Sequence, residues 1–565
     1  MAETRRRSEP AYRLRVEKDV EIPARDGARL MADIFRPDSE ERFPAVLNIG
    51  PYQKDKLWIP PPDLEEAPNE YMNWETANPL WWVPRGYILI RIDTRGTGKS
   101  LGHCDPGGLI EALDYYDAIE WAAKQDWCSG KVGTLGISYY ASVQWRVANL
   151  QPPSLKAIIP WEGWGDCYRD RCFHGGIFSL DFCSNWQSKY MAHHLLGKTF
   201  KYNTDSFRTE GLWECMRHSL DSNWWRERSA QWDKIDVPLF SVGNWGGHGL
   251  HLRGNVDGYV ESASRHKKLR IHTGTHFHPF HSEEGRVEQL RFLDFWLKGI
   301  DTGIMDEPPI NLQIRTGGGG PYTWRYENEW PLARTVWTKF YLHGQELSPA
   351  GKPRADGSLA RAPASEQGAL HYDATIMGRS GIPAASWAVQ LSGDGARFGV
   401  AFETDPLQED MEVTGPVKLV LWVSSTTEDM DIFATVRNIG PDSQDVFEIG
   451  PQGQKMPVAK GWLRASQRKL DPKRSTFYRP YHTHDERCEL VPDEPVCCEI
   501  EIWPTCIVFK AGHRIRLDIQ PRDGICSAPY THHHADYNMG RNAVHFGGPM
   551  PSHLLLPVIP ARSPL

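Results

Sequence analysis

The sequence predicts an α/β protein whose second half is all-β, and three observations lead to this fold class. In the first half, short apolar segments alternate with helical patterns, as in a parallel sheet that helices cover on both faces. After about Arg334, apolar residues recur at every second position, which is typical of strands with one buried face. A chain of 565 residues also exceeds what one hydrophobic core holds, so two or three domains are expected.

The expected strands of the first half are short and almost continuously apolar, as buried strands of a parallel sheet are. Between the second and the third strand, apolar residues at helical spacing predict a helix from Leu109 to Ala123. The expected strands are Ala45 to Ile49, Tyr87 to Ile92, Val132 to Ile137, Leu155 to Ile159, Leu239 to Val242 and Leu269 to His272.

Between Cys167 and Asp236 the strand rhythm stops and aromatic residues accumulate. An insertion between strands of an open α/β sheet lies over their carboxyl ends, where sites form. We therefore expect a helical cap over 167–235, although the same residues would also fit a hydrophobic cluster that thickens the domain. The aromatic residues are Phe173, Phe178, Phe182, Trp186, Tyr190, Phe200, Trp213, Trp224 and Trp225.

In the second half, turn residues punctuate the alternating segments, which predicts a β-sandwich. Alternation is clearest at Val417, Leu419, Leu421 and Val423, at Ile500 and Ile502, and at Ile515, Leu517 and Ile519. The expected domains are a catalytic α/β domain over 1–166 and 236–334, the cap over 167–235, and the C-terminal β-domain over 335–565.

Composition and charge exclude several partners. The formal net charge is −8 and the only basic block is Arg5 to Arg7, so nothing predicts a nucleic-acid partner. No stretch has the length and apolarity of a membrane span, and the first residues contain no apolar signal core, so we expect a cytoplasmic protein without a membrane partner. The 11 cysteines lack a framework spacing, which favours free thiols.

Ser138 is the candidate nucleophile. It follows the apolar strand that ends at Ile137 and precedes a run rich in helix formers, the context of a nucleophile elbow. Gly136 matches the glycine before such a serine, whereas Tyr140 stands where a second glycine is usual. A serine before a helix is also a common N-cap, so the motif alone leaves both interpretations open.

A serine nucleophile needs a base, and in α/β hydrolases the histidine follows the last strand of the sheet. The loop after Leu269 to His272 contains His276 and His278, with His281 further along. His272 belongs to the strand itself and is disfavoured. Both His276 and His278 satisfy the expected position of a general base.

Several further segments match one known pattern: Asn48 to Tyr52, Ile92 to Ser100, Asp126 to Gly133, Phe295 to Gly299, Pro416 to Ser424 with Asp431 and Phe433, Ala511 to Leu517, and Pro551 to Pro557. With these segments the chain resembles the CocE/NonD hydrolases, the cocaine-esterase-like group related to Xaa-Pro dipeptidyl-peptidases and α-amino-acid ester hydrolases. The resemblance covers nearly the whole chain. It implies an α/β-hydrolase domain, a helical cap and a C-terminal jelly roll.

The resemblance also implies an oxyanion hole made by the backbone N–H of Tyr139 and the hydroxyl of Tyr52, and a phenol is a suitable neutral donor for that role. Two ways of aligning the histidine loop point to His276 or to His278, and we favour His276.

The family's acid does not match. Its aspartate lies two residues after the tryptophan that closes the preceding strand, and Gly247 occupies that place. Asp166, which follows the strand after the nucleophile helix, is one replacement, although an ion pair with Arg169 or Arg171 would equally explain it. Asn244 is another, as a neutral amide that orients the imidazole. The third explanation is weak or altered hydrolytic activity.

Histidine clusters raise the question of a metal. They are His276, His278 and His281, His532 to His534, and His482, His484 and Cys488. Histidines in surface loops explain these clusters better than a ligand set, because hydrolytic zinc sites usually add a carboxylate or a distant histidine. We expect no metal and no cofactor.

The sequence thus predicts a serine hydrolase that cleaves an ester or amide of a small molecule through an acyl-enzyme. The aromatic cap and Trp74, Trp81 and Trp82 favour a bulky or aromatic acyl group. Alternatives are an acyltransferase on the same scaffold and a binding or scaffold protein, which would explain Gly247. Association of β-domain faces would give a homodimer.

Overall fold

The computed structural model describes residues 7–55, 61–73, 75–191, 211–344, 355–374, 399–523, 532 and 539–560. The chain divides into two compact units. The first comprises Met1–Asp170, Cys183–His218 and Asn223–Asn311, and the second comprises Arg171–Phe182, Ser219–Ser222 and Leu312–Leu565. The last boundary between the two units follows Asn311, whereas the sequence predicts a domain boundary near Arg334.

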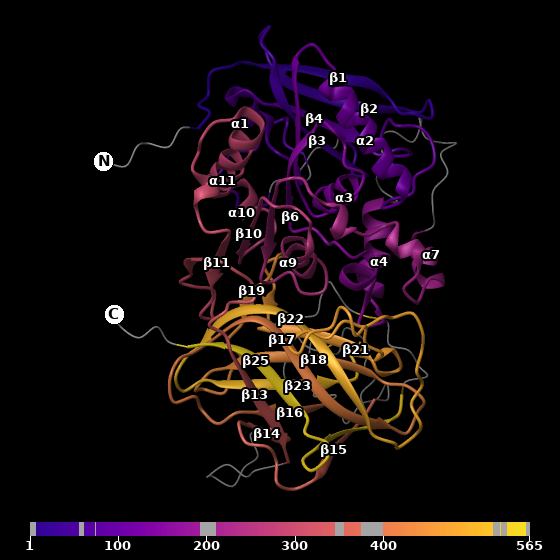
Figure 1. Cartoon of the computed structure of the whole chain (residues 1–565), viewed down its shortest axis with the longest axis vertical. Coiled ribbons are helices and arrows are strands. Elements are labelled where there is room, and N and C mark those ends of the chain that lie inside the picture. The colour runs from indigo at the N-terminus through magenta and orange to yellow at the C-terminus, as the bar shows by residue number, and fades with distance from the viewer. Residues whose placement is uncertain are drawn as a thin grey trace. The chain divides into compact units, whose positions relative to one another are not determined.

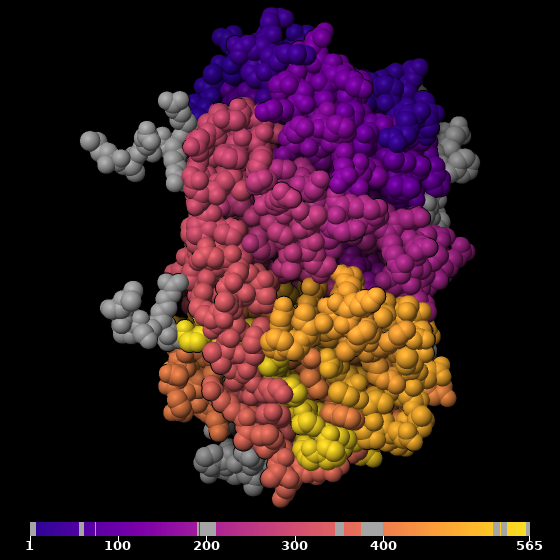
Figure 2. Space-filling model, in the orientation of Figure 1, coloured from indigo at the N-terminus to yellow at the C-terminus, as the bar shows by residue number. Residues whose placement is uncertain are grey.

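The first unit contains a mainly parallel sheet in the order β1-β2-β4-β3-β5-β6-β9-β10. Its strands are β1 (Leu14–Pro23), β2 (Arg29–Pro37), β3 (Phe43–Gly50), β4 (Ile88–Asp93), β5 (Cys128–Ile137), β6 (Leu155–Trp161), β9 (Leu239–Asn244) and β10 (Lys267–His272). Neighbouring strands along the order β4-β3-β5-β6-β9-β10 pair in parallel, and β1 and β2 add an antiparallel edge. All six expected strands are confirmed within a few residues, whereas β1 and β2 were not expected. β1 is partly exposed, and the indigo atoms of the N-terminal part of the chain lie at the margin of the first unit in Figure 2.

Helices lie on both sides of this sheet (Figure 1). On one side, α2, α3 and α9 pack against β3, β5, β6 and β9. On the other, apolar residues of α1, α11 and η5 join those of the strands in one buried cluster. The helices are α1 (Pro79–Trp82), α2 (Leu109–Ala123), α3 (Tyr139–Ala148), α9 (Leu252–Glu261), α10 (His278–His281) and α11 (Glu283–Leu293), with short helical turns η1 (Val83–Arg85), η4 (Trp232–Lys234), η5 (Asp294–Lys298) and η6 (Ile304–Asp306).

The segment expected as a cap is mainly helical where it is described. Its elements are η2 (Cys167–Cys172), β7 (Phe173–His174), β8 (Ile177–Phe178), α4 (Leu180–Asn185), η3 (Trp186–Met191), α7 (Gly211–Arg217) and α8 (Asn223–Arg226). Two pieces of it, Arg171–Phe182 and Ser219–Ser222, belong to the second compact unit. Phe200 and the side chain of Tyr190 lie outside the described residues. The cap therefore stays a prediction.

The second unit is built mostly of strands. They are β12 (Thr323–Glu327), β13 (Val336–His343), β14 (Gly357–Ala360), β15 (Gly368–Asp373), β16 (Val400–Glu403), β17 (Met411–Ser425), β18 (Asp431–Ile439), β19 (Glu448–Ile449), β20 (Lys455–Met456), β21 (Ala459–Arg464), β22 (Val496–Phe509), β23 (Arg514–Gln520), β24 (Arg541–Phe546) and β25 (His553–Ile559), with the turn η8 (Ala465–Gln467). β11 (Ile310–Ile314) leads into this unit from the first.

The prediction of an all-β second half is confirmed, whereas a jelly roll is not. Within the described residues, nine strands pair in the closed order β17-β22-β21-β18-β23-β16-β14-β13-β25, because β25 also pairs with β17. This closure makes a barrel and leaves no free edge on those strands. The residues that alternate along β17, β22 and β23 line its buried core, as the sequence predicts.

Two further findings concern the described residues only. No helix among them is long and apolar enough to cross a membrane. Every cysteine among them is a free thiol.

Candidate active site

Ser138 forms the turn between β5 and α3. Its backbone has φ 57° and ψ −112°, a conformation that costs a non-glycine residue free energy. Its hydroxyl does not cap α3. Instead, Oγ lies 3.3 Å from Nε2 of His251. The N-cap interpretation therefore does not describe this serine, whose side chain is turned toward an imidazole.

Tyr140 fits in place of the usual second glycine because two other glycines, Gly50 and Gly136, make room for it. A Cβ on Gly50 would lie 2.4 Å from Tyr140 Cε1, and one on Gly136 would lie 2.6 Å from Tyr140 Cβ. A Cβ on Gly163 would lie 2.6 Å from that of Ala141. The elbow thus keeps its close packing, with the glycines on neighbouring segments.

Glu162 is the carboxylate at the centre of the site, and sequence reasoning missed it. It follows β6 directly, has φ 49° and is fully buried. Its Oε2 accepts a hydrogen bond of 2.7 Å from Nδ1 of His276. Its Oε1 accepts from Nδ2 of Asn244 at 3.2 Å and lies 3.4 Å from Nε2 of His272. The signal in the sequence was its place at the end of the strand after the nucleophile helix.

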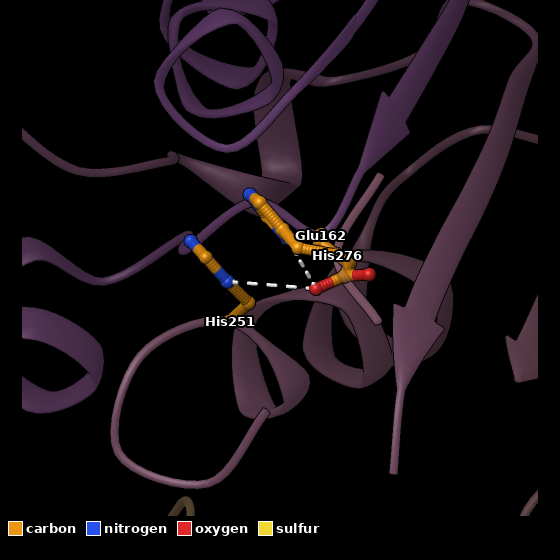
Figure 3. Close-up of side chains that lie close together, drawn as sticks. All are labelled: Glu162, His251 and His276. Atoms are coloured by element: carbon orange, nitrogen blue, oxygen red, sulfur yellow. Dashed lines mark hydrogen bonds and ion pairs between the residues drawn. The ribbon is translucent and has the colours of Figure 1, made fainter. Parts of the chain in front are cut away.

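Two histidines share this carboxylate (Figure 3). Nδ1 of His251 lies 3.9 Å from the same Oε2 that His276 contacts. The two rings face each other with centroids 5.2 Å apart and planes 4° from parallel. His251, from the turn before α9, touches the serine, whereas His276 makes the short contact with the carboxylate.

A second carboxylate reaches His276. Oε1 of Glu75 lies 3.4 Å from its Nε2. Glu75 is itself held beside the nucleophile, because its backbone oxygen accepts a hydrogen bond from the N–H of Ile137. Both ring nitrogens of His276 therefore face carboxylate oxygens.

These surroundings separate the pKa values of the three histidines. Burial lowers the pKa of His276, but the charge and hydrogen bonds of Glu162 and Glu75 outweigh burial and raise it to about 10. Burial, with the charge of His276, holds the pKa of His251 well below its usual value. Burial lowers that of His272 to about 4. His276 is thus a cation at neutral pH, whereas the other two histidines, His251 and His272, are neutral.

Asp166, one expected acid, lies elsewhere. Its carboxylate forms an ion pair of 2.9 Å with Arg169 and caps the N–H of the same residue. Burial acts against its charge, but Arg169 and Arg253 lower its pKa. Next to it, Asp170 pairs with Arg253 at 2.9 Å. The structure shows Asp166 in the ion pair that the sequence offered as its other explanation.

Asn244 and Gly247 lie beside the site. The amide of Asn244 donates to Glu162 and, at 2.9 Å, to the backbone oxygen of Gly274. It therefore positions the carboxylate and the histidine loop. A Cβ on Gly247 would lie 3.7 Å from that of His251, so the place of the family's aspartate adjoins this second histidine.

The two residues expected to supply the oxyanion donors pack against each other through their rings. Tyr139 begins α3, and its ring centroid is 5.9 Å from that of Tyr52. The hydroxyl of Tyr52 accepts a hydrogen bond of 2.9 Å from Nε1 of Trp186, so its own proton can point to another acceptor. The hydroxyl of Tyr139 donates to Glu111, which leaves its backbone N–H as the group expected to face the oxyanion.

The described histidines of the three clusters face different partners. His276, His278 and His281 face different carboxylates, Glu162, Glu65 and Glu66. His484 contacts Gln467, and His532 contacts His174 and Asp523. His533 and His534 lie outside the described residues.

Among the described residues, two sets of possible metal ligands remain. In the first, Glu162, His251 and His276 bring ligand atoms within 4.8 Å of one another. The two rings are stacked with nearly parallel planes, so one ion cannot lie in both ring planes (Figure 3). Asp19, Asp33 and Asp55 also cluster, but the ammonium group of Lys54 contacts all three. Neither set fits a metal.

The chain is similar to known proteins along both halves. Residues 26–278 match the X-Pro dipeptidyl-peptidase (S15) family, and residues 302–555 match the X-Pro dipeptidyl-peptidase C-terminal non-catalytic domain. The cocaine esterase of Rhodococcus sp. (strain MB1 Bresler) is 25% identical, with 96% of this chain and 98% of that protein covered.

Solved structures extend the likeness. The crystal structure of a CocE/NonD family hydrolase from Staphylococcus aureus is 30% identical, with a TM-score of 0.85 and 97% of this chain and 94% of that chain covered. An α-amino acid ester hydrolase has a TM-score of 0.70 at 18% identity over 96% of each chain, which shows a shared fold.

Proposed function

The chain belongs to the CocE/NonD hydrolase family and is a carboxylic ester or amide hydrolase, and we propose that it acts through an acyl-enzyme on Ser138. The observation that carries this proposal is the contact of Ser138 Oγ with an imidazole that lies beside a buried carboxylate. A hydroxyl becomes a nucleophile when a base can take its proton.

The proposed reaction has two halves. Oγ of Ser138 attacks the substrate carbonyl while an imidazole takes the hydroxyl proton, and the oxyanion forms hydrogen bonds to the hydroxyl of Tyr52 and the N–H of Tyr139. The imidazolium then protonates the leaving group. Water attacks the acyl-enzyme by the same route. Two imidazoles, those of His276 and His251, lie beside Glu162 and are candidates for this base.

A buried carboxylate beside the imidazoles favours turnover over the scaffold alternative. Gly247 has no carboxylate at the position of the family's aspartate, but Glu162, which follows β6, places a carboxylate beside His276. Glu162 therefore takes the part for which the sequence offered Asp166 or Asn244.

We further propose an apolar or aromatic acyl group. Two aromatic rings lie beside the proposed catalytic residues. Trp164 stacks against His251 with ring planes 15° apart, and Nε1 of Trp186 donates a hydrogen bond to the hydroxyl of Tyr52. Trp82, by contrast, is part of the buried core of the first unit, and Trp74 lies outside the described residues. The expected result is a higher kcat/KM for p-nitrophenyl benzoate than for p-nitrophenyl acetate, and the reverse order would contradict this proposal.

The test of the serine mechanism is intact-mass spectrometry after treatment with a fluorophosphonate. The full chain is expected to gain one adduct, and Ser138→Ala none. Absence of an adduct on the unmodified chain, or an adduct that survives Ser138→Ala, would overturn the proposal. Hydrolysis with and without an added amine or alcohol acceptor separates a hydrolase from an acyltransferase.

A further inference from the structure

We infer that His251 is the base that takes the proton of Ser138, and that His276 is an imidazolium held between two carboxylates. The inference rests on the proposed serine mechanism. It reverses the expectation from the histidine loop, in which His276 is the base, and it gives His251 a catalytic role that no feature of the sequence indicated.

The contacts of His251 are those of a base. Its Nε2 lies 3.3 Å from Oγ of Ser138, where a neutral ring nitrogen accepts the hydroxyl proton. Its Nδ1 lies 3.9 Å from Glu162, beyond hydrogen-bond distance, so Glu162 does not hold the ring in its charged form before the reaction. The planes of Trp164 and His276 run nearly parallel to the ring and restrict its rotation.

The contacts of His276 are those of a donor at both nitrogens. Nδ1 lies 2.7 Å from Glu162 and Nε2 lies 3.4 Å from Glu75. An ionised carboxylate only accepts hydrogen bonds, so each nitrogen that faces one carries a proton. The ring therefore has no lone pair for the proton of Ser138.

The charged and titratable groups around the two rings come from several segments. Glu162 follows β6, Glu75 precedes α1, and His272 ends β10. The remaining groups of this set are the two imidazoles themselves and the hydroxyl of Ser138. Burial and the charge of His276 hold the pKa of His251 well below its usual value, which keeps this ring neutral through the neutral pH range.

The proton step follows from these positions. The O–H bond of Ser138 breaks as Oγ bonds to the carbonyl carbon, and the proton moves to the lone pair of His251 Nε2. The carbonyl electron pair moves onto oxygen and forms the oxyanion. When the intermediate collapses, Nε2 returns the proton to the departing alkoxide or amine. Glu162, near Nδ1 of both rings, offsets the additional positive charge.

The test measures the rate of fluorophosphonate labelling of the full chain by intact mass. His251→Gln is expected to slow labelling by about 100-fold or more, the range of a lost general base, and His276→Gln by less than about tenfold. His266→Gln is the matched control, because His266 is exposed in the loop before β10 and is expected to leave the rate unchanged. Thermal unfolding of each variant shows whether it is folded.

A second measurement needs no variant. With His251 as the base, the labelling rate of the unmodified chain is expected to change less than about threefold between pH 6 and pH 9. A rate that rises about tenfold per pH unit over this range would mean that His276 must first lose its proton. That profile, or a larger loss in His276→Gln than in His251→Gln, overturns the inference while leaving Ser138 as nucleophile. No adduct at Ser138 overturns the proposed function instead.

Discussion

Glu162 provides the negative charge on which the proposed site depends. In Glu162→Gln the shape is kept, but the charge beside both imidazoles is lost, and the amide presents a donor to one of them. We expect kcat/KM to fall by about 100-fold to 10,000-fold, as when a triad carboxylate becomes an amide. Hydrolysis of a p-nitrophenyl ester measures this change.

The matched comparison is Asp166→Asn. Its carboxylate pairs with Arg169, so this variant is expected to lower the unfolding temperature with kcat/KM of the folded protein within about tenfold of the original. A large loss of activity in Asp166→Asn, with little in Glu162→Gln, would return the acid to the residue expected from the sequence.

The substitution Tyr52→Phe distinguishes a role in substrate binding from a role in stabilising the transition state. Tyr52→Phe removes one oxyanion donor and leaves the ring packed near Tyr139. Because the hydrogen bond strengthens as charge develops on the carbonyl oxygen, we expect kcat to fall by about 100-fold to 1,000-fold with little change in KM. Steady-state kinetics check this split. A rise in KM at constant kcat would instead assign Tyr52 to substrate binding.

Residues that belong to a local motif were predictable, and residues joined only by the fold were not. Ser138 stands in an elbow and His276 in the loop after the last strand, so chain order was enough to nominate them. Glu162 turns into the site through a left-handed backbone conformation, and His251 enters from a turn after β9. Neither position carries a motif, and their meeting depends on packing between β6, α9 and β10.

At the scale of elements, we expect helix α9 to set the distance between His251 and Glu162. Gly254, in its first turn, approaches the loop that follows Glu162, and a Cβ there would lie 2.3 Å from the backbone nitrogen of Gly165. Gly254→Ala must therefore push the helix from the loop. We expect a loss of about 1 to 3 kcal/mol in stability, and labelling of Ser138 at least about tenfold slower in the folded protein.

Gly258→Ala, in the same helix, is the control. A Cβ there would lie 2.6 Å from the ring of Trp145, away from Glu162. It is expected to destabilise the protein to a similar degree and to leave the labelling rate of the folded fraction within about threefold. Equal effects of both variants on labelling would show that α9 does not position His251.

The parallel strands were predictable as elements because each is a continuous apolar run. β1 and β2 were not, because they pair antiparallel at an edge, and β1 exposes much of one face. In the second unit, alternation identified the strands. It could not show whether their ends join, and the pairing of β17 with β25, which closes the barrel, is a long-range contact.

At the scale of the whole molecule, the two units have separate cores, one around the parallel sheet and one inside the barrel. Proteins of this kind often unfold in more than one transition. A substitution in the active site is then expected to move one transition in calorimetry and to leave the other in place. We expect this of His276→Gln, because every contact described for this histidine lies in the first unit.

The pH dependence of that transition tests the charge of His276 independently of catalysis. Its pKa is raised to about 10 in the folded protein and is about 6.5 when unfolded. A raised pKa stabilises the folded state fully below pH 6.5, and this contribution decreases as the pH rises toward 10. The lowered pKa of Lys298, about 8, acts in the opposite direction above pH 8, so the comparison with His276→Gln is needed to isolate the effect.

The unfolding temperature of the first unit is therefore expected to fall more between pH 7 and pH 10 in the unmodified chain than in His276→Gln. Between pH 7 and pH 10, the difference in unfolding temperature between the two proteins is expected to be greatest at pH 7 and to narrow as folded His276 loses its proton. Parallel curves for the two proteins over this range would mean that His276 is neutral in the folded state. Its two carboxylate contacts would then not hold it as a cation, and His276 would be free to act as the base.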